Sequence, residues 1–100
     1  MSKPRILSGM QPSGKLHVGN YLGALKQFVD LQETHEAFFM LADYHALNSV
    51  QDAETLKEYT LDLAASYVAA GIDPDRSVIF KQSDVPEHTE LTWIFNTLTT

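Results

Sequence analysis

The chain has 100 residues, a net charge of −6 from 7 basic and 13 acidic residues, and no cysteine. A hydrophobic fraction of 44% is ordinary for a folded domain, and the absence of cysteine excludes a disulfide scaffold and a thiolate metal site. The acidic balance has the wrong sign for gripping phosphates, so we expect any nucleic acid to bind mainly through regions outside these residues. No apolar stretch is long enough for a signal peptide or a membrane span, and we expect a cytoplasmic protein with no membrane partner.

The first half of the chain predicts two strands around one helix. Residues 5–8 form a short apolar strand candidate that Gly9 closes, and a turn-rich loop follows at residues 11–14. Residues 36–42 form a continuous apolar run, which is typical of a strand buried on both faces and is short for the alternative, a buried helix. The helix between the two strands is indicated by an apolar stripe of Val18, Leu22, Leu25 and Val29.

A long helix is predicted next. Asp52 is placed to cap its start, and Gly71 and Pro74 end it in the usual order. Its apolar stripe consists of Leu56, Tyr59, Leu63, Tyr67 and Ala70. We expect Leu63 of this helix and Leu25 of the preceding one to be buried against the sheet.

The last part of the chain predicts a third strand and a third helix. Residues 77–80 form the strand candidate. Asp84 and Glu87 have the spacing of a capping box, and Pro86 lies in the first turn, where its missing N–H does no harm. The helix then carries Leu91, Ile94, Phe95 and Leu98.

Strands and helices therefore alternate along the whole chain. This order predicts an α/β fold in which a parallel sheet is flanked by helices and joined by right-handed crossovers. It corresponds to the first half of a Rossmann-like doubly wound sheet. Residues 97–100 carry no helix stop signal, so we expect the chain to end inside an element and a second half to be missing.

The loop between the first strand and the first helix is the most informative about function. Ligands bind at the carboxyl ends of parallel strands, where this loop begins. Gly9 and Gly14 permit backbone angles that other residues resist, and a helix starting near His17 offers free N–H groups to an anion. His17 and Asn20 share one face of the first turn, and Gly19 leaves room for a flat group. We expect a nucleotide there, with its phosphates over the helix start.

This loop carries neither G-x-G-x-x-G nor G-x-x-x-x-G-K-[ST], which disfavours hydride transfer and P-loop hydrolysis. Instead, His17-Val18-Gly19-Asn20 resembles the HIGH signature of class I aminoacyl-tRNA synthetases in its tryptophanyl form. Asn20 departs from the generic histidine at the fourth position, as is typical of the tryptophan branch. Further segments that resemble this branch are residues 11–14, 21–25, 42–47 and 83–86, so the resemblance covers essentially the whole chain.

The resemblance implies roles for individual residues. The residues expected to contact ATP are Gln11, Pro12, Ser13, Gly19 and Asn20. His17, acting with Asn20 in catalysis, is expected near the phosphates, where charge develops. Leu7 and His45 are expected to border the tryptophan pocket. No residue of the chain is expected to bind a metal.

The resemblance also implies an activity. Members of this branch join tryptophan and ATP into tryptophanyl-adenylate with Mg²⁺ present, and then pass the aminoacyl group to tRNA(Trp). The chain would be the N-terminal half of the catalytic, nucleotide-binding domain of such an enzyme, which as a full-length protein would be a homodimer. Neither the lysine-containing second signature nor the acidic acceptor for the indole N–H is in the sequence. The segment alone is therefore expected to be a poor enzyme.

Two other functions stay open. A tyrosyl-tRNA synthetase, or another HxGH-type nucleotidyltransferase, would use the same loop, and the physical features alone do not separate tryptophan from tyrosine. A non-enzymatic role as an assembly or folding fragment is the third hypothesis. The amino acid that drives pyrophosphate exchange into ATP separates the first two, and recovery of activity with the missing half tests the third.

Several residues also have simpler structural interpretations. His17 could merely start a helix, and His45 could merely bond to backbone. Asp43 is expected to form a turn, and both His35 and His88 to face solvent. The aromatic residues expected in the core or at an interface, rather than on a substrate, are Tyr59, Tyr67, Trp93 and Phe95.

Overall fold

The computed structural model describes residues 3–14 and 21–99. Its sheet has three strands, β1 (Arg5–Met10), β2 (Glu36–Leu41) and β3 (Val78–Lys81). All neighbours are parallel, in the order β1-β2-β3, with Arg5 opposite Glu36 and Leu41 opposite Lys81. The predicted three-stranded parallel sheet is confirmed, although β1 continues through Gly9 to Met10.

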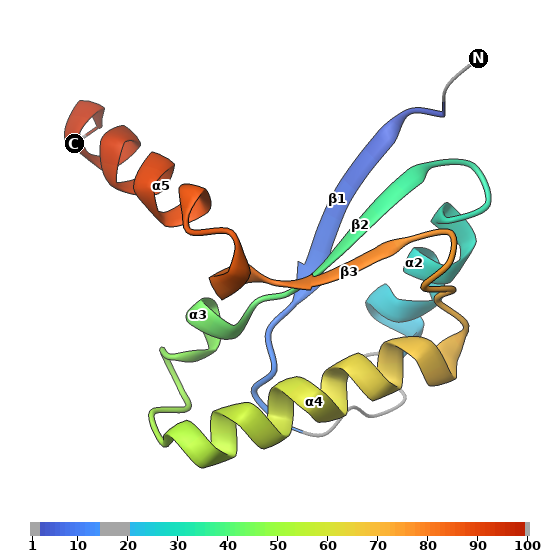
Figure 1. Ribbon diagram of the computed structural model, residues 1–100, viewed down its shortest axis with the longest axis horizontal. Helices are drawn as coiled ribbons and strands as arrows, with labels where there is room; N and C mark the ends of the chain where they lie inside the picture. The colour runs from blue at the N-terminus through green and yellow to red at the C-terminus, as the bar shows by residue number, and fades with distance from the viewer. Residues whose placement is uncertain (1–2, 15–20, 100) are drawn as a thin grey trace.

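Helices connect and follow the strands (Figure 1). After β1, a π-helical turn, η1 (Tyr21–Leu25), runs directly into α2 (Lys26–Leu31). After β2 come the short α3 (Asp43–Ala46) and the long α4 (Ala53–Ala70). After β3 come a single 3-10 turn, η2 (Gln82–Asp84), and α5 (Glu87–Leu98). In the part of the chain described, no helix is both long and apolar enough to cross a membrane.

The ends of α4 follow the local signals in the sequence. The carboxylate of Asp52 accepts a hydrogen bond from the Thr55 backbone N–H at 3.0 Å, which satisfies one free donor at the helix start. Gly71 adopts a φ of 120° at the other end, a conformation that side chains resist. The N–H of Ile72 then donates back to the Tyr67 carbonyl at 3.0 Å. The predicted start and end of this helix are confirmed.

The core lies between β2 and the two helices α2 and α4, which cover the same face of the sheet (Figure 1). Leu25 and Leu63 are each 2% exposed, as predicted. The rings of Phe28 and Phe39 stack with centroids 4.8 Å apart. Tyr67 is fully buried, and its hydroxyl donates to the Met40 carbonyl at 3.0 Å. Burial raises the pKa of Tyr67, because the interior disfavours the phenolate.

The opposite face of the sheet is only partly covered. Side chains of β2 alternate between buried, as for Phe39, and half-buried, as for Phe38 and Met40. Leu7 of β1 is 56% exposed on this side. The prediction that residues 36–42 are buried on both faces is therefore wrong for the residues described. The reason is that α5, the element that follows β3, extends away from the sheet (Figure 1).

The predicted capping box before the last helix is also wrong. Asp84 belongs to η2, where its carboxylate lies 3.8 Å from the Lys81 ammonium. Pro86 occupies the N-cap position of α5, and no side chain caps this end of the helix. The chain leaves β3 through a 3-10 turn, so the Asp84–Glu87 spacing that suits a capping box falls across two different elements.

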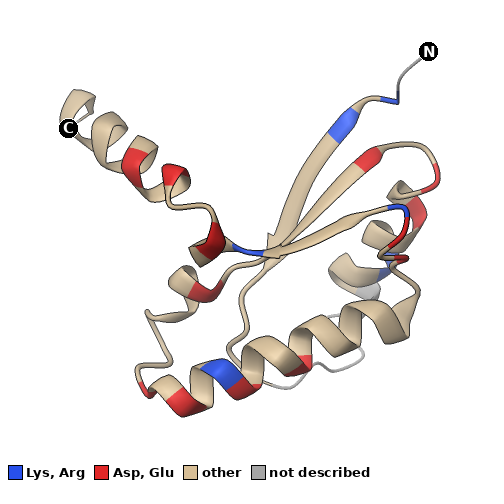
Figure 2. Ribbon diagram, in the orientation of Figure 1, with Lys and Arg blue, Asp and Glu red and all other residues tan. Residues whose placement is uncertain are grey.

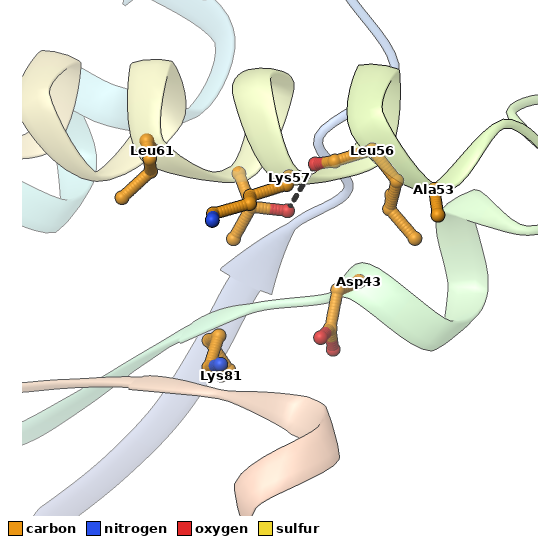
Figure 3. Close-up of a pocket in the computed structure, with 7 residues that line it drawn as sticks. Asp43, Ala53, Leu56, Lys57, Leu61 and Lys81 are labelled. Carbon is orange, nitrogen blue, oxygen red and sulfur yellow. Dashed lines mark hydrogen bonds between the residues drawn. The ribbon is translucent and has the colours of Figure 1, made fainter.

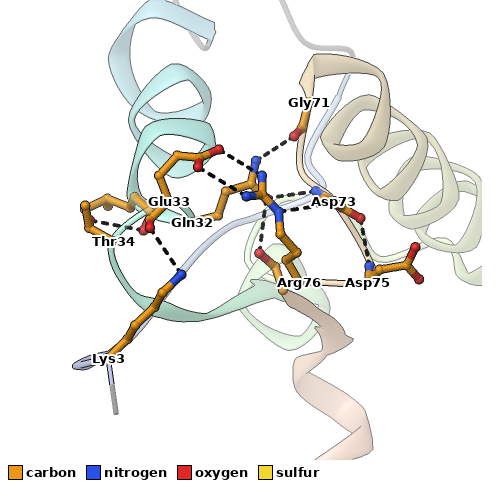
Figure 4. A network of polar contacts seen from close by, with 10 residues as sticks. Lys3, Gln32, Glu33, Thr34, Gly71, Asp73, Asp75 and Arg76 are labelled. Carbon is orange, nitrogen blue, oxygen red and sulfur yellow. Dashed lines mark hydrogen bonds and ion pairs between the residues drawn. The ribbon is translucent and has the colours of Figure 1, made fainter. Parts of the chain in front are cut away.

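A polar network joins the segments that precede β2 and β3 (Figure 4). Gln32 is 3% exposed, and its Nε2 donates to the Gly71 carbonyl at 2.7 Å. Its Oε1 accepts from the Asp73 N–H at 2.8 Å and from the Ser77 hydroxyl at 3.2 Å. Nearby, Arg76 donates two hydrogen bonds to the Glu33 carboxylate, and these lower the pKa of Glu33. These hydrogen bonds hold the segment before β2 and the segment before β3 together at the amino-terminal edge of the sheet.

Candidate functional site

The candidate site lies at the carboxyl-terminal edge of the sheet. Here the three strands end at Met10, Leu41 and Lys81, and residues 11–14, α3 and η2 follow them. The edges of β1 and β2 stay joined at this end, because the Ala42 N–H donates to the Met10 carbonyl at 2.9 Å. Ligands of open parallel sheets bind at this edge. The structure thus places residues 11–14, the described part of the loop singled out in the sequence, where a ligand site is expected.

Gly9 allows β1 and β2 to approach closely beside this loop. A Cβ atom at Gly9 would lie 2.5 Å from the Met40 carbonyl oxygen, a distance that backbone atoms do not permit. Neither Gly9 nor Gly14 has a positive φ, and the space around a Cβ at Gly14 is open. The sequence-based argument that both glycines supply unusual backbone angles is therefore wrong. A glycine is needed at position 9 because a side chain there would collide with Met40. Nothing in the described structure requires a glycine at position 14.

The first residues expected to contact ATP are Gln11, Pro12 and Ser13. A tight turn forms here, with the Ser13 N–H donating to the Gln11 carbonyl at 3.0 Å. Gln11 and Ser13 are exposed beyond the end of β1, whereas Pro12 is fully buried. Gln11 and Ser13 are therefore accessible to a ligand, whereas the buried Pro12 holds the turn in place.

The other residues predicted for the nucleotide are His17, Gly19 and Asn20. All three lie outside the described residues, so their roles stay predictions. The described chain resumes at Tyr21 with η1, whose π-helical turn leads into α2. Residues 15–20 therefore connect an exposed turn at the carboxyl end of β1 to a helix packed on the sheet.

Leu7 faces a cavity of about 300 Å³ on the partly covered side of the sheet. Its lining comes from β1, β2, η2 and α5, and consists of Leu7, Met40, Gln82, His88, Leu91, Thr92 and Phe95. We call it the Leu7 cavity. A second hollow of about 340 Å³ also borders Leu7 and His88 and includes the exposed faces of Phe38 and Phe80. Apolar walls with a few polar groups are usual for a small-molecule site.

His45, the other residue expected at the tryptophan pocket, is exposed on α3. It does not line the Leu7 cavity, but its backbone N–H donates to Gln82 Oε1 at 3.1 Å, and Gln82 does line it. The structure thus connects Leu7 and His45 through Gln82. Asp43, expected to form a turn, starts α3 and accepts a hydrogen bond from the Tyr44 N–H at 3.1 Å.

Another cavity, of about 310 Å³, lies between the first half of α4 and the end of β3 (Figure 3). Lys57 and Leu61 point into it from α4, with Asp43 and Lys81 on the opposite side. Of the residues predicted for ATP or tryptophan, those that the structure describes do not line it: Leu7, Gln11, Pro12, Ser13 and His45. The Leu7 cavity is therefore the better candidate for the substrate.

Among the described residues, the carboxyl-terminal edge carries few basic side chains and no cluster of metal ligands. Acidic side chains are spread over α4 and α5, and Lys81 is the basic residue at the junction of β3 and η2 (Figure 2). Over residues 3–14 and 21–99, no three His, Cys, Asp or Glu side chains gather as metal ligands would. The described surface therefore provides neither a basic patch for RNA nor a protein cage for a cation.

The sequence-based expectations for the Leu7 cavity had mixed outcomes. His88 is half-buried, not solvent-facing, and its ring meets Phe80 edge-on at 6.2 Å. Phe95, expected in the core or at an interface, is 55% exposed and lines the cavity, so it lies outside the core of the described chain. Gln82 was not singled out. Its position directly after β3 was the available signal, since ligand contacts gather at carboxyl ends of parallel strands.

His35 and the remaining aromatic residues show mixed outcomes. His35, expected to face solvent, is half-buried, and its Nδ1 lies 2.8 Å from the Thr34 hydroxyl. Tyr67 is in the core, as expected, and Tyr59 is half-buried. Trp93 is 72% exposed and so lies outside the core of the described chain.

Comparison with known proteins gives consistent matches. The family described as tRNA synthetases class I (W and Y) matches residues 1–100. A tryptophan–tRNA ligase from Fusobacterium nucleatum is 59% identical over 95 residues, which are 95% of this chain and 29% of that protein. The chain thus spans less than a third of the length of this relative.

Solved structures agree with the sequence matches. The chain is similar to tryptophanyl-tRNA synthetase from Campylobacter jejuni complexed with ADP and tryptophan, with a TM-score of 0.88 and 52% identity over 96% of this chain and 30% of that one. It is also similar to tyrosyl-tRNA synthetase from Archaeoglobus fulgidus complexed with L-tyrosine, with a TM-score of 0.84 and 27% identity over 100% of this chain and 33% of that one. The sheet, the loop at its carboxyl edge and the family match lead to one conclusion: this chain belongs to the class I tRNA synthetases of the tryptophan and tyrosine family.

Proposed function

We propose that these residues form the N-terminal part of the catalytic domain of a tryptophan–tRNA ligase. In a chain of the relatives' length, they would help to activate tryptophan with ATP and transfer it to tRNA(Trp). The observation that carries this proposal is the difference in identity between the two branches of the family. The tryptophan enzymes of the comparison are between 35% and 59% identical to the chain, against 27% for the tyrosine enzyme.

The proposed reaction has two steps. A carboxylate oxygen of tryptophan attacks the α-phosphorus of ATP, and the bond to the leaving pyrophosphate breaks. A hydroxyl of the terminal tRNA ribose then attacks the carbonyl carbon of the adenylate, and AMP leaves. The protein's contribution to the first step is to align the two substrates and to direct donors at the charge that develops on the phosphates.

ATP would bind over the carboxyl end of β1. Gln11 and Ser13 are exposed there and would contact the nucleotide, while buried Pro12 would fix the turn. His17 and Asn20 would act on the phosphates from the next helix start, with Gly19 leaving room for the nucleotide. Support for this arrangement comes from the position of residues 11–14 at the carboxyl edge and from the ADP complex of the Campylobacter jejuni relative.

The indole of tryptophan would occupy the Leu7 cavity. Leu7, Met40 and Phe95 offer apolar contacts, and Gln82 offers a polar group in the same wall. A volume of about 300 Å³ is at the lower end of the range for small-molecule sites. His45 would border the pocket through its contact with Gln82.

Mg²⁺ would enter with the nucleotide. The described residues hold no cluster suited to a metal ion, and Mg²⁺ at nucleotide sites is bound largely by phosphate oxygens and water. Its chemistry would be to neutralise charge on the phosphates. Binding of tRNA(Trp), formation of a homodimer and location in the cytoplasm complete the proposal. The acidic surface favours an RNA site on residues beyond these.

The test is amino-acid-dependent exchange of labelled pyrophosphate into ATP by a full-length protein that contains residues 1–100. We expect tryptophan to drive the exchange and tyrosine not to. Exchange driven by tyrosine would favour the sister enzyme instead. No exchange with either amino acid would leave a non-enzymatic role as the better explanation.

A further inference from the structure

Asp43, the first residue of α3, holds η2 in place. The residue is 9% exposed, and both of its carboxylate oxygens accept hydrogen bonds. Oδ1 accepts from the Ser83 N–H at 3.0 Å and from the Tyr44 N–H at 3.1 Å. Oδ2 accepts from the Ser83 hydroxyl at 2.5 Å. We call this contact the Asp43–Ser83 latch. It joins two segments that lie 40 residues apart in the chain and follow neighbouring strands.

The latch constrains orientation as well as distance. A buried carboxylate is costly to desolvate unless donors satisfy it, and here three donors do so. Two of them come from the same residue, Ser83, through its backbone and its side chain. A single arrangement of α3 against η2 is favoured as a result.

Two site residues lie directly beside the latch. Gln82 precedes Ser83 in the chain and lines the Leu7 cavity. His45 lies two residues after Asp43 and donates its backbone N–H to Gln82 Oε1 at 3.1 Å. The latch therefore fixes the backbone on both sides of the His45–Gln82 contact. The His45 N–H in turn holds the oxygen of the Gln82 amide.

We propose that Asp43 is a positioning residue for tryptophan binding. It holds Gln82 in the wall of the Leu7 cavity and His45 beside it, without touching the substrate. The inference rests on the proposed function, because it requires tryptophan to occupy that cavity.

Asp52 provides a matched control. Its carboxylate accepts from the backbone N–H of Thr55 at 3.0 Å and from the Thr55 hydroxyl at 2.6 Å, the same pair of donors that Ser83 offers to Asp43. Asp52 caps α4, however, and lines neither the Leu7 cavity nor its neighbours. If Asp43 contributed only to folding, substitutions at both aspartates would lower stability and leave tryptophan binding unchanged.

The experiment uses a full-length protein that contains residues 1–100, with pyrophosphate exchange and urea unfolding measured side by side. We expect Asp43→Ala and Ser83→Ala each to raise the KM for tryptophan, by about tenfold for Asp43→Ala, with the KM for ATP unchanged. Both changes remove the same latch, so the double variant should differ little from Asp43→Ala alone. Ser83→Thr keeps the hydroxyl, so its KM for tryptophan should be close to the wild-type value. Asp52→Ala should lower the urea midpoint with both KM values unchanged.

An unchanged KM for tryptophan in folded Ser83→Ala would overturn the inference, as would an equal rise in Asp52→Ala. If Asp43→Ala does not fold, Ser83→Ala and Ser83→Thr decide the question by themselves. A wild-type protein that shows no tryptophan-dependent exchange would overturn the proposed function instead. The two failures are therefore distinguishable.

Discussion

The two edges of the sheet use their polar side chains differently. At the amino-terminal edge, the buried Gln32 amide bonds to Gly71, Asp73 and Ser77, and Arg76 bridges to the preceding turn (Figure 4). At the carboxyl-terminal edge, the Asp43–Ser83 latch and the His45–Gln82 contact join two loops beside a cavity.

The difference indicates that one edge of the sheet contributes to stability and the other to ligand binding. At the amino-terminal edge, the hydrogen bonds satisfy buried polar groups within the protein. The carboxyl-terminal edge leaves Gln11, Ser13 and His45 exposed around its contacts. Substitutions at the first edge should therefore change folding free energy, and those at the second should change substrate affinity or rate. This division can be tested in a full-length protein that contains these residues.

The largest effect is expected in the core that supports both edges. Leu63 is 2% exposed in the layer between α4 and the sheet. Leu63→Ala should lower the free energy of unfolding by about 2–5 kcal/mol, because it leaves a cavity in packed surroundings. Leu61, on the same helix, is 63% exposed, and Leu61→Ala should stay within about 0.5 kcal/mol. Urea unfolding measures both, and equal losses would contradict the placement of the core.

His17→Ala should affect rate more than stability. A donor directed at developing charge acts on the transition state, and its removal typically costs about 2.7–4 kcal/mol, or a factor of about 10²–10³. We expect a loss of that size in single-turnover formation of tryptophanyl-adenylate at saturating ATP. Tryptophan affinity, titrated separately, should change little.

Asn20→Ala provides the companion measurement for His17. The two side chains are expected on one helical face and should act together, so the losses in the double variant should not add. A near-wild-type rate in His17→Ala would show that this histidine only starts a helix. The helix N-terminus would then carry the phosphate site with Gly19.

Gln32→Ala should weaken the amino-terminal edge alone. It leaves the Asp73 N–H and the Gly71 carbonyl without their partner, at a cost of about 1–3 kcal/mol in unfolding free energy. The KM for tryptophan should not change. Gln27→Ala, at an exposed position of α2, is the control and should be close to neutral. A raised KM for tryptophan in Gln32→Ala, with a wild-type KM in Gln27→Ala, would contradict the division between the two edges.

The smallest effect is expected when the pH is lowered and Glu33 becomes protonated. The hydrogen bond from Arg76 lowers the pKa of Glu33 below its ordinary value of 4.5. A carboxyl with a lowered pKa contributes stability above the unfolded value, and this is lost as pH falls through the folded value. Glu33→Gln should therefore unfold with a smaller dependence on pH below 4.5 than the wild type. Because both side chains are exposed, added salt should reduce the difference, and an unchanged acid response would exclude this pair as its source.

Local signals predicted the three strands and the ends of α4. Asp52 and Gly71 each act within a few residues of their own position, so the ends of α4 could be predicted from the sequence. The Asp84–Glu87 spacing misled, because the 3-10 turn after β3 takes up Asp84 before α5 begins. Burial of residues 36–42 on both faces was overestimated, since the sequence does not reveal where α5 goes.

The candidate site was harder to predict from sequence. The position of residues 11–14 followed from topology, because every parallel strand ends at the same edge. The Asp43–Ser83 and His45–Gln82 contacts join residues about 40 apart, and only the assembled sheet brings them together. His88 was misread for the same reason, as its burial against Phe80 depends on the path after β3.

Amide hydrogen exchange with tryptophan and a non-hydrolysable ATP analogue tests the division between the edges most directly. The measurement compares each backbone segment of residues 1–100, within the full-length protein, with and without the two ligands. We expect exchange to slow at residues 11–14, in α3 and in η2, and to stay unchanged at residues 32–36 and 71–77. Protection confined to the amino-terminal segments, or absent from α3 and η2 while the ligands are bound, would contradict the account.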